Sequence, residues 1–110
     1  RLPVVVAMTC IAGMYSSPGY VCLAEAFLRN AGSGAVSTVS PTGLSQDADA
    51  MEINREIMEL LSCGTRARLG DIVGQSFSVY NRQSPEPFTP VWIYNLLGDP
   101  ALRLTTTVSQ

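Results

Sequence analysis

The chain has 110 residues, of which 46% are hydrophobic, and a formal net charge of −2. This length supports one domain with a modest hydrophobic core, and the composition excludes a disordered chain. The charges form no basic patch or run of like sign, so the sequence predicts no nucleic acid partner and no membrane partner.

The first apolar segment, Leu2–Met8, has the composition of a buried parallel strand. Three consecutive valines and apolar residues on both faces are typical of a strand that helices cover on both sides. We therefore expect Val5 to be almost fully buried. The segment is far shorter than the roughly 18 residues that a membrane span needs. Because the chain enters this strand directly and without an initiator methionine, we also expect it to be part of a larger protein.

A strand–helix–strand unit follows from the next segments. Apolar residues recur at helical spacing over residues 23–31, and Gly32 and Gly34 suit the end of that helix. Ala35–Val39 is the predicted second strand, in which Val36 should be almost fully buried. The two strands of such a unit run parallel.

Two amphipathic helices are predicted next. Gln46–Ser62 places Glu56 on its polar face, and a further helix begins near Thr65, which could cap it. The apolar face of the first helix consists of Ile53, Ile57, Leu60 and Leu61. The apolar stripe of the second consists of Leu69, Ile72, Val73, Phe77 and Tyr80.

The last third of the chain should contain a loop, a strand and a turn. Asn81–Pro90 holds three prolines and is predicted to be a loop. Val91–Leu97 is the predicted last strand, in which Trp92 and Tyr94 should pack. We expect this strand in a parallel sheet, on the far side of the first strand or farther out, with helices on both faces of the sheet.

Cys10 lies where the first strand ends, directly before a turn that contains Gly13. Open α/β sheets carry their chemistry at this carboxyl edge. A structural thiol is the alternative, because free cysteines are often buried. We favour a nucleophile, although the chain contains no histidine that could serve as its general base.

The other candidate residues are interpreted as structural. Cys22 and Cys63 should be small core residues, and the three cysteines lack metal-ligand spacing. A disulfide between Cys10 and Cys22 is not favoured. Glu25 should tie its helix to neighbouring backbone or to an arginine, and Asp99 should accept hydrogen bonds from backbone within a turn.

Four blocks, Ala7–Gly13, Cys22–Arg29, Gly34–Val36 and Leu97–Leu102, together resemble the gingipain-type cysteine peptidases, relatives of caspases and legumains. The resemblance implies an α/β, caspase-like three-layer fold with a mostly parallel sheet. Residues 1–104 would be the later, C-terminal half of the catalytic domain, and residues 105–110 an exit into a linker.

The resemblance implies a mechanism. Cys10 would be the nucleophile of a Cys/His dyad, with the histidine in a segment upstream of Arg1. Its thiolate would attack a peptide carbonyl, and backbone N–H groups, including that of Cys10, would hold the oxyanion. The partners would be a peptide or protein substrate and the upstream half of the same domain. The substrate-binding residues would be those of the loop after the second strand: Thr42, Gly43, Leu44, Ser45 and Gln46.

The resemblance also bears on cofactors and location. It implies a secreted or cell-surface bacterial protein that needs no cofactor. The acidic residues Asp47, Asp49 and Glu52 are interpreted as a helix N-terminal turn that complements the helix dipole, with a calcium site as the alternative.

Two other functions stay open. A catalytically inactive caspase-like scaffold would bind peptides or partner domains at the same edge. A flavodoxin-like module would bind a small ligand, but Gly13 alone does not make a phosphate-binding loop.

Overall fold

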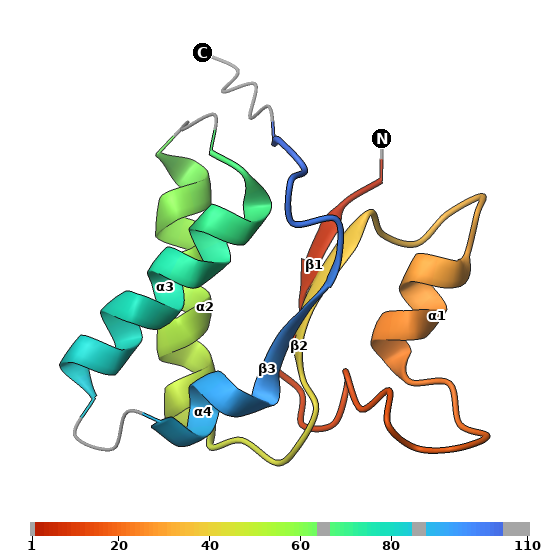
Figure 1. Cartoon of the computed structure of the whole chain (residues 1–110), viewed down its shortest axis with the longest axis horizontal. Coiled ribbons are helices and arrows are strands. Elements are labelled where there is room, and N and C mark those ends of the chain that lie inside the picture. Colours follow the sequence, from red (N-terminus) through yellow and green to blue (C-terminus); the bar gives the residue numbers. More distant parts are fainter. Residues whose placement is uncertain (1, 64–66, 85–87, 105–110) are drawn as a thin grey trace.

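The computed structural model describes residues 2–63, 67–84 and 88–104. Its centre is a sheet of β1 (Val4–Val6), β2 (Ser37–Pro41) and β3 (Tyr94–Gly98), in the order β1-β2-β3. Helix α1 lies on one side of this sheet, and α2 and α3 lie on the other (Figure 1). The described part of the chain is therefore a small α/β arrangement with helices on both faces of the sheet.

The sheet is mixed rather than parallel. β1 and β2 are parallel, with Val4 opposite Ser37, as predicted. β3 is antiparallel to β2, with Leu96 opposite Val39, and it does not lie beyond β1. The prediction for the last strand was wrong because the chain re-enters the sheet from the carboxyl end of β2 rather than from its amino end. α2 runs back along the sheet and α3 returns to the carboxyl end of β2, so β3 starts there and runs in the opposite direction (Figure 1).

Helix α1 (Leu23–Arg29) is shorter than predicted, and Asn30 is its C-cap. The chain then turns at Gly34, whose φ is +95°. This turn allows the Ala35 backbone N–H to donate to the Phe27 carbonyl, at 3.1 Å. The left-handed conformation at Gly34 thus aims the chain from α1 into β2.

We expect Gly34→Ala to destabilise the chain by about 2 kcal/mol or more. A side chain is strained at this φ, and the new Cβ would collide with the Phe27 carbonyl oxygen. Gly32→Ala is the matched control, because a Cβ there would meet nothing within 4 Å. Urea unfolding of both variants measures the difference, and equal free energies of unfolding would contradict the role of Gly34.

The two long helices lie where the sequence predicts them. α2 spans Asp47–Ser62 and α3 spans Leu69–Gln83. Arg68 is the N-cap of α3, whereas Thr65, the predicted cap, lies outside the described residues. Glu56 was wrongly assigned to the polar face, because it is buried and its carboxylate pairs with the Arg55 guanidinium at 2.6 Å.

The segment before β3 is helical, which the sequence did not predict. α4 spans Phe88–Ile93, so the predicted loop Asn81–Pro90 overlaps both α3 and α4. Pro90 is compatible with the helix because it lies in the first turn, where backbone N–H groups have no intrahelical partner. The strand consequently begins only at Tyr94. Tyr94 is buried as expected, whereas Trp92 is 78% exposed and does not pack.

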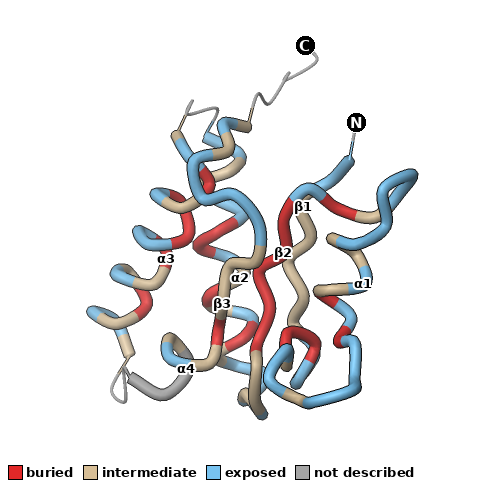
Figure 2. Tube along the Cα trace, turned by 45° about the vertical axis from the view of Figure 1, so that its right-hand side comes forward, coloured by how far each residue is buried: buried red, intermediate tan, exposed pale blue. Residues whose placement is uncertain are grey.

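The core lies between the sheet and the two long helices. Its buried residues come from β2, α2, α3 and β3: Val39, Ala50, Ile53, Ile57, Leu69, Val73, Tyr80 and Tyr94. Figure 2 shows these buried positions along the inner sides of α2 and α3 and along β2. The predicted apolar faces of α2 and α3 therefore supply most of the core.

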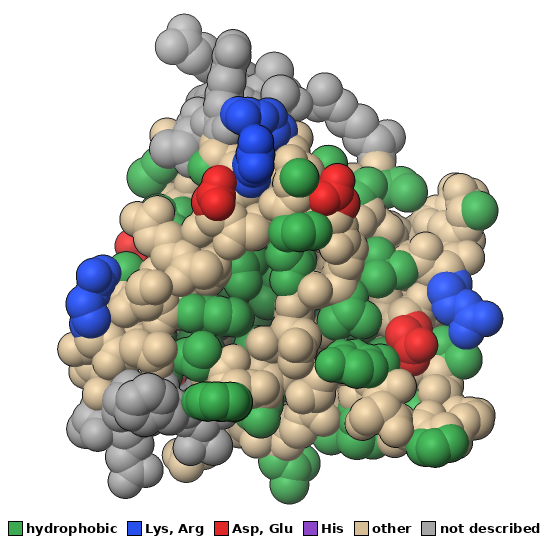
Figure 3. Space-filling model, viewed as in Figure 1, with side chains coloured by type: hydrophobic (Ala, Val, Ile, Leu, Met, Phe, Trp, Pro, Cys, Tyr) green, Lys and Arg blue, Asp and Glu red, His purple; other side chains and the backbone are tan. Residues whose placement is uncertain are grey.

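Coverage of the sheet is incomplete. Val5 is only half-buried and Val36 is 38% exposed, so both burial predictions were wrong. β1 has three residues and pairs on one side only within the described sheet, and α1 has seven residues. Because these elements are short, they leave much of the surface of the neighbouring strands accessible to solvent. Figure 3 shows hydrophobic side chains in the middle of one molecular face, over the sheet, with charged side chains nearer its rim.

Candidate active site

Cys10 follows β1, and the loop of residues 42–46 follows β2. Because these strands are parallel, their carboxyl ends meet at one edge of the sheet. There the Cys10 thiol donates to the Ser45 carbonyl, with Sγ and oxygen 3.4 Å apart. The Ser45 backbone N–H donates to the same sulfur at 3.5 Å. The fold thus brings together the half-buried strand-end thiol and the loop predicted to bind substrate.

Backbone hydrogen bonds fix the two loops against each other. The Ile11 N–H donates to the Gly43 carbonyl at 3.2 Å, and the Gly13 N–H donates to the Pro41 carbonyl at 2.8 Å. Ile11 has a φ of +58°, the one positive φ of a non-glycine residue in the described ranges. A β-branched residue rarely adopts this conformation, which costs about 1–3 kcal/mol. The turn that presents Cys10 is therefore strained and is held by its neighbours.

The predicted substrate loop is also fastened to the start of β3. Thr42 donates twice to the Ile93 carbonyl, from its backbone N–H at 2.7 Å and from Oγ1 at 3.0 Å. The Ser45 hydroxyl and the Tyr94 hydroxyl are hydrogen-bonded at 3.3 Å. Leu44, in contrast, is 81% exposed. The loop has a fixed base and an apolar side chain presented to solvent.

Tyr94 is the residue of this site that the sequence did not single out. Burial raises the pKa of its hydroxyl, the charges of Cys10 and Asp49 raise it further, and the Ser45 hydrogen bond opposes the shift. Tyr94 therefore stays protonated near neutral pH. The sequence showed only an aromatic residue in a strand, which gave no sign of this contact.

A family model described as peptidase family C25, the gingipain family, matches residues 1–105. The chain belongs to the gingipain family. This family consists of cysteine peptidases, which agrees with a thiol at the carboxyl edge of the sheet. No curated protein and no solved structure matches the chain.

The three cysteines of this gingipain-family chain are all free. Cys22 is buried at 1% exposure, as predicted. Cys63 was wrongly placed in the core, since it is exposed. It is the C-cap of α2, beyond the last helical residue, and so lies outside the apolar stripe.

Two acidic residues have the structural roles that the sequence predicts. The Glu25 carboxylate accepts a hydrogen bond from the Cys22 backbone N–H at 3.1 Å, as part of a capping box at the start of α1. The Asp99 carboxylate accepts one from the Ala101 backbone N–H at 2.8 Å, within the turn after β3. Both residues therefore stabilise local backbone.

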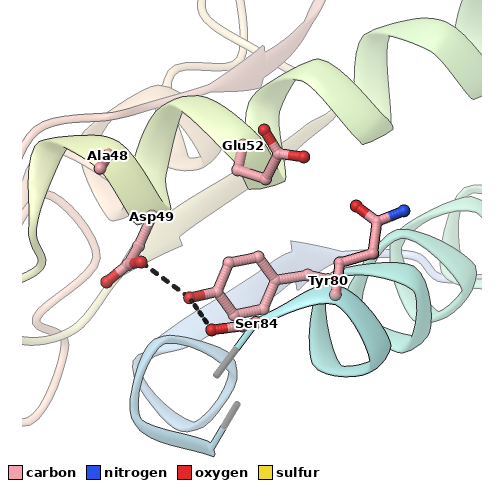
Figure 4. Close-up of a pocket in the computed structure, with 6 residues that line it drawn as sticks. Ala48, Asp49, Glu52, Tyr80 and Ser84 are labelled. Carbon is pink, nitrogen blue, oxygen red and sulfur yellow. Dashed lines mark hydrogen bonds between the residues drawn. The ribbon is translucent and has the colours of Figure 1, made fainter. Parts of the chain in front are cut away.

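A cavity of about 350 Å³ lies between α2 and α3, away from Cys10 (Figure 4). Its lining residues are Ala48, Asp49, Glu52, Tyr80, Gln83 and Ser84. The Tyr80 hydroxyl donates to Asp49 at 2.8 Å, and the hydrogen bond with Arg55 lowers the pKa of Glu52.

Within residues 2–63, 67–84 and 88–104, no group of three or more His, Cys, Asp or Glu side chains could hold a metal ion.

In the same described ranges, no helix combines the length and the apolar character that crossing a membrane requires.

Proposed function

We propose that the chain belongs to the catalytic domain of a cysteine endopeptidase and that Cys10 is its nucleophile. The observation that carries this proposal is the contact between the Cys10 sulfur and Ser45, because it joins a strand-end thiol to the loop that follows the neighbouring parallel strand. Membership of a peptidase family supplies the reaction class. Cys22 is buried and Cys63 lies at the end of α2, so neither is a better candidate.

The general base of the dyad comes from outside the chain in this proposal. The chain has no histidine, and a nucleophilic thiol needs a neighbouring base that takes its proton. We place the histidine in a segment upstream of Arg1 that completes a caspase-like domain. The 110-residue chain alone is then inactive.

The reaction proceeds by acyl transfer. The Cys10 thiolate attacks the peptide carbonyl carbon and forms a C–S bond, while backbone N–H groups, including that of Cys10, stabilise the oxyanion. The upstream histidine, which has become an imidazolium by taking the Cys10 thiol proton, gives that proton to the leaving amine as the C–N bond breaks. Water hydrolyses the thioester and releases the second product and the free thiol.

The substrate-binding part of the proposal concerns residues 42–46. Their base is fastened to Ile93 and Tyr94, so this wall keeps its shape when a peptide binds. Leu44, which is 81% exposed, is an apolar side chain of this loop that a substrate can contact. By family resemblance we propose a peptide or protein substrate, no cofactor, and a secreted or cell-surface bacterial protein.

The test is peptide hydrolysis by the domain extended upstream to include a histidine-bearing segment. We expect cleavage of a mixed peptide library, and we expect an irreversible thiol inhibitor with a peptide recognition group to form an adduct at Cys10, mapped by mass spectrometry. Cleavage products are also identified by mass. If the extended domain binds peptides without cleaving them, the peptidase proposal is wrong and the inactive scaffold is the correct function.

A further inference from the structure

Two hydrogen bonds connect the Tyr94 hydroxyl to the Cys10 sulfur by way of Ser45. The Tyr94 and Ser45 hydroxyls are 3.3 Å apart. The Ser45 backbone N–H donates a hydrogen bond to Cys10 Sγ, with nitrogen and sulfur 3.5 Å apart. Tyr94 can therefore influence the sulfur through the position of Ser45.

Tyr94 is the fixed end of this connection. It is 3% exposed and belongs to the core cluster with Val39 and Ile53. Its backbone is paired with Pro41 in the sheet. Ser45 is half-buried in an irregular loop between β2 and α2, so the rigid side chain holds the loop rather than the reverse.

The orientation of Ser45 matters because its backbone presents two opposite dipoles to the sulfur. The protonated thiol benefits from both, since it donates to the carbonyl and accepts from the N–H. A thiolate benefits only from the N–H and is repelled by the carbonyl oxygen. The N–H and the carbonyl of Ser45 belong to successive peptide units, so a small rotation of the Ser45 backbone changes the balance between the two contacts with the sulfur.

We propose that Tyr94 is a positioning residue for Cys10, which orients the Ser45 backbone N–H toward the sulfur through the hydrogen bond between the two hydroxyls. This inference rests on the proposed function in so far as the sulfur acts as a nucleophile. Tyr94 keeps its proton when the sulfur is ionised, because burial and the neighbouring charge both raise the pKa of the phenol. The hydrogen bond to Ser45 consequently persists in the reactive state.

The experiment measures the rate of Cys10 alkylation by iodoacetamide in the 110-residue chain, with each labelled peptide quantified by mass spectrometry. Exposed Cys63 serves as the internal reference. We expect Tyr94→Phe and Ser45→Ala each to slow Cys10 alkylation about five-fold, the factor that corresponds to one ordinary hydrogen bond. The double variant should be no slower than the slower single variant, because both changes remove the same interaction. Ser45→Thr keeps a hydroxyl and should retain most of the rate.

Tyr80→Phe is the matched control. It also removes a hydroxyl from a buried tyrosine, one that donates to Asp49 rather than to the loop at the site. It should leave the Cys10 rate unchanged. The inference is wrong if Tyr80→Phe slows Cys10 as much as Tyr94→Phe does, if Ser45→Ala has no effect, or if the rate rises. Alkylation needs no peptide cleavage, so a failure of the peptidase proposal would appear in the hydrolysis assay alone.

Discussion

Replacing Cys10 with alanine in the histidine-bearing domain should lower kcat/KM for peptide hydrolysis by roughly 10⁴-fold or more. The reason is that, among the described residues, neither of the other two thiols is placed to accept the acyl group in the proposed mechanism. Cys22 is 1% exposed, and Cys63 follows the last residue of α2. Hydroxyls of the neighbouring loop, such as that of Ser45, are far weaker nucleophiles than a thiolate. Initial rates with a fluorogenic peptide measure the loss.

Cys63→Ser is the control for this substitution. It removes a thiol that is more exposed than that of Cys10, and it should leave kcat/KM within about two-fold of the wild-type value, as surface substitutions usually have small effects. A Cys10→Ala domain that keeps a tenth or more of the activity would contradict the proposed nucleophile. An equal loss in both variants would indicate that general thiol chemistry, rather than Cys10, had been measured.

The sequence was sufficient to predict the neighbourhood of Cys10 because that neighbourhood follows from topology. Two parallel strands joined by a helix must end at the same edge, so Cys10 and Ser45 had to be near each other once β1 and β2 were recognised. The contact between the sulfur and the Ser45 backbone also depends on which residues of the two loops lie opposite each other. Hydrophobic periodicity does not specify this. The roles of Glu25 and Asp99 were predictable for a related reason, since both depend on local backbone geometry.

The features that were not predicted depend on distant parts of the chain. The direction of β3 depends on how α2 and α3 pack, and the residue pattern of a short strand does not specify its direction in the sheet. The exposure of Val36 and Trp92 depends on how far neighbouring elements extend over them. The contact between Tyr94 and Ser45 joins residues 49 positions apart in the sequence, so local patterns carried no sign of it.

The stability of the site should depend on the helix that begins directly after residues 42–46. Ile57 of α2 is fully buried in the core cluster with Ile53, Leu69 and Val73. Ile57→Ala removes three carbons from that cluster and should destabilise the chain by about 2–5 kcal/mol. This loss is a large share of the roughly 5–15 kcal/mol that stabilises an ordinary domain. The free energy of unfolding in urea measures it.

Met51→Ala is the comparison that isolates burial, because it shortens another large apolar side chain of α2, one that is 70% exposed. It should change the free energy of unfolding by less than about 0.5 kcal/mol. Since Gln46 is both the N-cap of α2 and the last residue of the predicted substrate loop, loosening of α2 should also reach Ser45. Ile57→Ala should therefore slow Cys10 alkylation even where the chain remains folded, whereas Met51→Ala should not. If both variants were equally stable, the core would not lie between α2, α3 and the sheet, and the helix could not be the support of this loop.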